Sequence, residues 1–182
     1  MKKIIIIAFL IMFACNILLS QEQQVYIVGS DDADAVYWLN GQRNVLPRYD
    51  SFAEAVGIAI SGSNVYIAGN DGMNAVYWLN GQQNILPKSG AYARVYAIAI
   101  SGSDIYIAGT DGENAVYWLN GQRNILPKTS SRAGATGIAL SDSSVIIIGI
   151  DGGSAVFWQN GQQNILPASG SSSAAMAIAI IE

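Results

Sequence analysis

The chain has no histidine, and its single cysteine, Cys15, lies close to the N-terminus. A protein cleaved after Ser20 would therefore have no thiol, no imidazole and no disulfide. This composition excludes the most common general base, the thiol nucleophile and most transition-metal sites. We expect a protein that is stabilised by packing alone, is not an enzyme and uses no cofactor.

Basic residues are also scarce. The chain carries 9 Lys and Arg against 13 Asp and Glu, a formal net charge of −4. Removal of residues 1–20 takes away Lys2 and Lys3, which leaves a net charge of 7 − 13 = −6. The sequence contains no basic cluster, so nucleic acid and anionic membrane surfaces are not expected as partners.

The N-terminus predicts export. Two lysines precede an almost continuous apolar run over residues 4–19, which is typical of a signal peptide, here 1–20, cleaved after Ser20. Lipidation of Cys15 is the alternative, although Phe13 is bulky where a lipoprotein signal has a small residue. The run is short for a span of about 20 residues. We expect a secreted, periplasmic or cell-surface protein with no membrane span in its mature form.

Residues 21–182 are dominated by an internal repeat. The stretch AVYWLNGQ begins at Ala35, Ala75 and Ala115 and returns as AVFWQNGQ at Ala155, a spacing of 40 residues each time. The four units are 25–64, 65–104, 105–144 and 145–182. Such a period predicts one supersecondary unit per repeat, packed against its neighbours.

Each unit contains four short stretches that are typical of β-strands. In the second unit we expect strands over 65–68, 75–79, 82–86 and 95–100. Asn80-Gly81 forms a two-residue hairpin turn, because both residues tolerate a positive φ. Pro87 ends the third strand, because it cannot donate to the ladder.

The fourth strand of each unit alternates small and large apolar residues. In the second unit one face holds the small set and the other the large set: Val95, Ala97 and Ala99 against Tyr96, Ile98 and Ile100. Both faces are apolar, so each sheet should lie between two others, with a bulky face on a small one. Four-stranded sheets packed in this way around an axis are the blades of a β-propeller.

We therefore predict an all-β fold, a four-bladed β-propeller with four antiparallel strands per blade. The C-terminal strand closes the ring, because Ala175–Ile181 would pair with Val25–Val28 and complete the first blade. A linear stack is less compatible, since it needs polar end repeats. The other alternative is a larger ring of two chains. The protein is thus a monomer, or a dimer if two chains share one ring.

The phrase SGSDIYIAG…NAVYWLNGQRNILP resembles exported repeat proteins of Bacteroidetes-type bacteria, whose repeats are similar to VSGSDVYVAG…YWKNG. The resemblance covers residues 25–182 and implies a β-propeller, but no activity, because its motifs build blades. The compact 40-residue repeat and the polar NGQ strand depart from that pattern. WD-repeat and kelch propellers are similar in layout only, since their Gly-His, Trp-Asp and paired-glycine motifs are absent.

One aspartate recurs in every repeat, and Asp71 and Asp111 are weak candidates for a metal site. Asn74 or Asn114 could supply further oxygen ligands for Ca²⁺. However, Asp-Gly is also an ordinary tight-turn pair, and no loop has EF-hand spacing. We favour the turn.

One tryptophan also recurs, two residues before each Asn-Gly turn: Trp38, Trp78, Trp118 and Trp158. These rings could stack against sugars, as in a lectin. They could equally pack between blades, with Arg43 or Arg123 over the ring. We favour packing, and keep a carbohydrate-binding module as the alternative function.

The loops that follow the prolines are the most divergent parts of the repeats, whereas the Ser-Gly-Ser and Asn-Gly turns hardly vary. Binding residues usually lie on the variable loops of a rigid scaffold, although unselected drift explains the same divergence. The candidate binding residues are Tyr49, Asp50, Tyr92, Arg94 and Arg132. We expect an exported, non-catalytic interaction scaffold that binds a protein or a glycan.

Overall fold

The computed structural model describes residues 23–142 and 144–181, so the expected signal peptide, including Cys15 and Ser20, lies outside the described residues. The described chain consists of β-strands joined by turns and loops, with no helix. Accordingly, it offers no helix that could cross a membrane.

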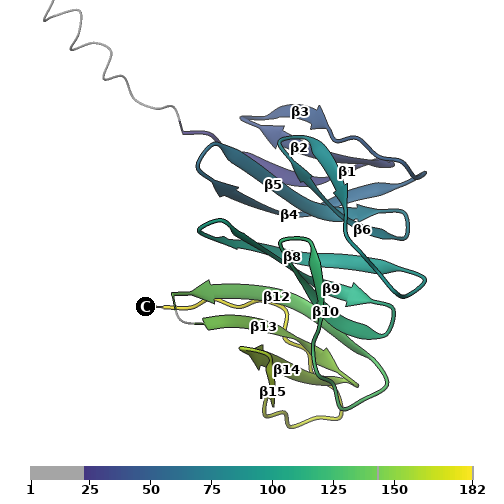
Figure 1. Cartoon of the computed structure of the whole chain (residues 1–182), viewed down its shortest axis with the longest axis vertical. Coiled ribbons are helices and arrows are strands. Elements are labelled where there is room, and N and C mark those ends of the chain that lie inside the picture. The colour runs from purple at the N-terminus through teal and green to yellow at the C-terminus, as the bar shows by residue number, and fades with distance from the viewer. Residues whose placement is uncertain (1–22, 143, 182) are drawn as a thin grey trace, which may run out of the picture.

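The strands form four antiparallel sheets that follow one another along the chain (Figure 1). The first sheet has three strands: β1 (Tyr26–Asp31), β2 (Asp34–Leu39) and β3 (Gln42–Val45). The second has four: β4 (Ala53–Ser61), β5 (Asn64–Asp71), β6 (Asn74–Leu79) and β7 (Gln82–Ile85). The third contains β8 (Ala93–Ser101), β9 (Asp104–Asp111), β10 (Asn114–Leu119) and β11 (Gln122–Ile125). The fourth contains β12 (Ala133–Ser141), β13 (Ser144–Asp151), β14 (Ser154–Gln159) and β15 (Gln162–Ile165).

The predicted Asn-Gly turns are confirmed. Leu79 pairs with Gln82, and the two residues between them have positive φ, 50° at Asn80 and 84° at Gly81. The Asn80 side chain also accepts a hydrogen bond from the Val65 N–H, at 2.9 Å. The turn after β6 is therefore fastened to the start of β5. The Asn80 amide also donates to the Asn64 side chain at 2.9 Å, as Asn120 donates to Asp104, which an aspartate could not do.

The first strands of the second, third and fourth sheets, here called the leading strands (β4, β8 and β12), contain a β-bulge. In β8 the pairing moves from Val95↔Gly109 directly to Ala97↔Ala108, so that Tyr96 is the extra residue. The predicted faces were therefore wrong: Val95 shares a face with Ile98 and Ile100, not with Ala97. The reason is that a bulge shifts the two-residue alternation by one.

Neighbouring sheets pack face to face, and the core lies between them. Trp118, Ile107 and Val95 of the third sheet are buried against Leu86 and Ala75 of the second. Equivalent clusters lie between the first and second sheets and between the third and fourth. The prediction of a bulky face on a small one is confirmed beyond the bulge, since a Cβ on Gly57 would lie 3.1 Å from the Ile98 side chain of the next sheet.

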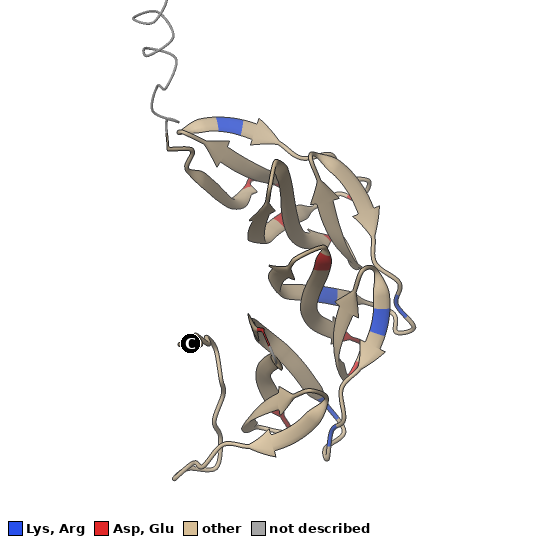
Figure 2. Cartoon of the chain, turned by 60° about the vertical axis from the view of Figure 1, so that its left-hand side comes forward, with Lys and Arg blue, Asp and Glu red and all other residues tan. Residues whose placement is uncertain are grey.

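The expected ring is not closed within the described chain. Figure 2 shows the sheets along an open arc, with the first and the last at its two ends. Residues 172–181 form no strand, and the expected pairing of Ala175–Ile181 with Val25–Val28 is absent. The three sheet-to-sheet junctions therefore do not bring the first and the last described sheet together.

Candidate functional site

The recurring aspartates join neighbouring sheets. Asp111 is fully buried, and its carboxylate accepts hydrogen bonds from the backbone N–H groups of Ser89 and Gly90, at 2.8 and 2.7 Å. Arg123, opposite Trp118, approaches the same carboxylate at 2.5 Å. Because Ser89 and Gly90 belong to the loop that leaves the second sheet, Asp111 acts as a latch between sheets. Asp71 and Asp151 hold the corresponding loops.

These latches depend on ionised carboxylates. Burial alone would raise the pKa of Asp151, but hydrogen bonds from the Thr129 N–H and hydroxyl, the Gln163 amide and the Ser130 N–H outweigh burial and lower the pKa to about 2. The pKa values of Asp71 and Asp111 are lowered against burial in the same way. No cluster of three His, Cys, Asp or Glu side chains suited to a metal occurs in the described residues. The hydrogen bonds of Asp71 and Asp111 to loop N–H groups give both side chains a structural role.

The recurring tryptophans also join sheets. Trp78, Trp118 and Trp158 are at most 1% exposed. The indole N–H of each donates to a proline carbonyl of the preceding sheet, at 2.7 to 2.8 Å: Pro47, Pro87 and Pro127 respectively. The packing interpretation is confirmed for these three rings, which are too buried to stack against a sugar. Trp38, on the first sheet, is half-buried.

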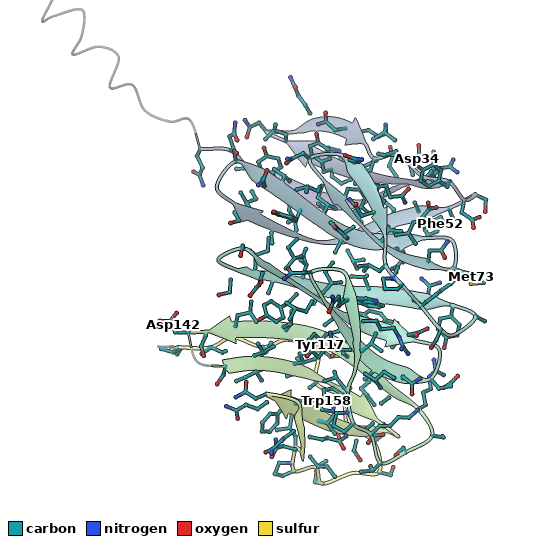
Figure 3. All side chains as sticks on the ribbon, viewed as in Figure 1. Asp34, Phe52, Met73, Tyr117, Asp142 and Trp158 are labelled. Carbon is teal, nitrogen blue, oxygen red and sulfur yellow. The ribbon has the colours of Figure 1, made fainter. Side chains whose placement is uncertain are left out.

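The five predicted binding residues all lie toward the variable-loop end of the sheets. Figure 3 marks this end with Phe52 and Met73, and the opposite end with Asp142. Tyr49 and Asp50 lie on the loop between the first two sheets, where Tyr49 is 80% exposed. Tyr92 and Arg94 lie at the junction of the second and third sheets, Tyr92 just before β8 and Arg94 on β8.

The structure spreads these residues over three junctions instead of gathering them. Arg94 on β8 pairs with Glu54 on β4 at 3.2 Å, so it joins two leading strands. Arg132, at the third junction, lies 3.3 Å from Glu113, and both side chains are exposed. Only Arg132 of the five lines the cavity described next.

A surface cavity of about 380 Å³ lies at the junction of the third and fourth sheets. Its walls come from β8, β9, β12 and β13 and from the turn after β13. The residues that define its chemistry are Tyr96, Thr110, Arg132, Thr136 and Ile150. The volume is within the range of small-ligand sites, and the walls are mainly apolar with a few polar groups.

The cavity opens where the repeat loses side chains. Gly134 occupies the position of Glu54 and Arg94, the pair that covers the preceding junction. Gly153 likewise replaces Met73 and Glu113 of the earlier repeats. Tyr96 is directed there as the extra residue of the β8 bulge and is 43% exposed. Comparison of the repeats could have revealed the glycines, but a bulge leaves no recognisable sequence signal.

A second hollow, of about 420 Å³, lies at the opposite end of the same sheets. It is bounded by Ile100, Leu140 and Ile180 and by the tight turns around Ser101, Ser141 and Asp142. Its walls are mainly polar and include no aromatic or basic side chain, so it is a less suitable site than the cavity at the variable-loop end.

No protein-family model matches the chain, and no curated protein matches it. Among solved structures, the chain is similar to the computationally designed protein Ika8, with a TM-score of 0.52 and 21% sequence identity. The match covers 90% of this chain and 51% of Ika8, so the chain spans about half the length of that protein. At this identity the similarity concerns the fold alone.

Proposed function

We propose that the protein is an exported, non-catalytic binding scaffold of the propeller type, in which the four sheets serve as blades. Its binding surface is the cavity lined by Tyr96, Arg132 and Thr136. The observation that carries this proposal is the position of the cavity. It lies at the variable-loop end, where glycines interrupt an otherwise regular repeat.

The chemistry of the cavity favours a protein partner. Apolar walls, one tyrosine and one arginine are the combination that dominates contact energies in protein interfaces. The exposed Arg132 guanidinium is suited to a carboxylate of the partner. The net negative charge of the chain disfavours nucleic acid. The buried tryptophans give the glycan alternative little support.

The test is capture of partners from the extracytoplasmic fraction of the native source, with a glycan array run in parallel. Gly134→Arg should fill the cavity and abolish capture, because Arg94 already occupies the equivalent position of the third sheet. Gly134→Ala is the matched control. It also replaces the glycine by a residue with a Cβ but does not fill the cavity. The Thr110 methyl, 3.1 Å from the new Cβ, needs to move only slightly.

Arg132→Ala should weaken capture without altering the fold, since the Arg132 side chain is 71% exposed. Gln82→Ala, on the exposed Asn-Gly end, should have no effect. Retention of the partner by Gly134→Arg together with its loss in Gln82→Ala would place the binding surface at the opposite end. Selective glycan binding would favour the lectin alternative.

A further inference from the structure

Within the described residues, the segment Ser173–Ile181, here called the tail, occupies the place of a leading strand but pairs with no strand of a further sheet. The Ser173 N–H donates to the Gly153 carbonyl at 2.8 Å, as the N–H groups of Ala53, Ala93 and Ala133 donate at the starts of β4, β8 and β12. The Ile178 side chain lies 3.8 Å from the Cβ position of Gly137, as Ile98 lies against Gly57. The Thr136 hydroxyl donates a hydrogen bond to the Ala175 carbonyl at 2.5 Å.

The first sheet has the complementary deficiency, because no leading strand pairs with it among the described residues. In the described chain β1 pairs with β2 alone, whereas β5, β9 and β13 each lie between two strands. The surroundings of Gly29 on β1 show that no strand lies beside it in the described chain. A Cβ there would have its nearest contact with Trp38 at 3.4 Å, whereas Gly69, Gly109 and Gly149 would meet a leading-strand carbonyl at 2.0, 1.9 and 2.0 Å.

The apolar side chains of the first sheet indicate the same missing neighbour. Ile27 is 57% exposed, but its equivalents Ile67, Ile107 and Ile147 are at most 2% exposed, because each packs against the preceding sheet. At the other end of the arc, Leu166 is the equivalent of Leu46, Leu86 and Leu126. Those three side chains are buried by a following sheet, whereas Leu166 is only partly buried.

The polar contacts also match in pairs. Among the described residues, the Trp38 N–H has no proline carbonyl as its partner, and the Pro167 carbonyl receives no tryptophan N–H, unlike the carbonyls of Pro47, Pro87 and Pro127. Similarly, Asp31 accepts no hydrogen bond from a loop N–H within the described chain, while Ser169 and Gly170 occupy the positions of the N–H donors to Asp71, Asp111 and Asp151. The two ends of the arc thus carry the two halves of a junction that the chain already makes three times.

We infer that two copies of this chain join head to tail, the tail of each serving as the leading strand of the other's first sheet. The two resulting junctions continue the three internal ones and close a single ring of eight four-stranded sheets, four from each chain. A repeated head-to-tail contact closes into a ring when its rotation allows. The arc in Figure 2 is open, and it matches half of a single Ika8 chain. Strand exchange also removes two exposed sheet edges.

The inference goes beyond the proposed binding function, and its test does not use the cavity. Native mass spectrometry and sedimentation velocity of the protein expressed from the full sequence should give twice the mass of one chain. Gly29→Ala should give the mass of a single chain with an unchanged circular dichroism spectrum. Its methyl group has space in one copy, but it would meet the Ala174 carbonyl of a partner's tail. Ser30→Ala, at an exposed position whose residue differs in every repeat, is the control and should stay dimeric.

A second pair of variants makes the result independent of Gly29. Ile27→Lys should yield single chains, whereas Ile85→Lys, at a position of similar exposure (60%) on the outer strand β7, should remain dimeric. The inference is overturned if the wild type has the mass of one chain, which would favour closure within a single chain. Filaments or higher oligomers would also overturn it, as would dimers that persist in both Gly29→Ala and Ile27→Lys.

Discussion

The first and third sheets have nearly the same sequence but different surroundings. Ile27 and Ile107 occupy equivalent positions, yet their exposed fractions are 57% and 1%. Trp38 is half-buried, whereas Trp118 is fully buried and hydrogen-bonded to Pro87. The difference teaches that burial in this protein is a property of the junction between sheets. A motif is part of the core only where a preceding sheet and a leading strand accompany it.

The largest effect should come from removing a buried ring at an internal junction. Trp118→Ala should lower the free energy of unfolding by about 3–5 kcal/mol, because it leaves a cavity and removes the N–H that serves the Pro87 carbonyl. Trp38→Ala should cost clearly less. Chemical denaturation checks this on single chains, at protein concentrations too low for association. Equal losses for the two variants would contradict the distinction between the sheets.

The next effect uses glycines at equivalent positions. Gly109→Ala should destabilise the protein by about 3 kcal/mol, because the added Cβ would lie 1.9 Å from the Arg94 carbonyl of the leading strand. Gly29→Ala should leave the stability of the single chain nearly unchanged. Thermal unfolding of the two variants, at protein concentrations too low for association, compares them directly. A destabilised Gly29→Ala chain would mean that β1 already has a strand beside it.

The smallest of the three effects depends on pH. Because hydrogen bonding lowers the pKa of Asp151 from 3.8 to about 2, the ionised latch stabilises the fold above about pH 4 and is lost as the pH falls toward 2. Asp151→Asn should therefore cost about 2 kcal/mol at neutral pH. The gap to wild type should close in acid.

Asp31→Asn is the matched control for this titration. The Asp31 side chain is 46% exposed and is paired with Arg43 on the surface, and exposed ion pairs contribute little. Urea denaturation at several pH values would test both variants. A pH-independent difference between Asp151→Asn and wild type would show that the latch does not rely on charge.

Much of the fold follows from the sequence. The 40-residue period fixes one sheet per repeat, and Asn80-Gly81 fixes a two-residue hairpin because both residues accept positive φ. The strands were predictable for the same local reason, since apolar runs alternate with turn residues. The positions of the loops after the prolines could also be located from the sequence, and Arg132, one of the predicted residues, lines the cavity.

The tertiary structure decided what local pattern cannot express. The bulge at Tyr96 depends on how β8 fits β9, so the predicted faces of the strand were displaced by one residue. The role of Asp111 depends on backbone N–H groups from another sheet, which no motif encodes. The open arc depends on the rotation between packed sheets, a quantity summed over all contacts of the junction. The sequence determined what each repeat becomes, and packing between repeats decided where the cavity opens and which ends stay unpaired.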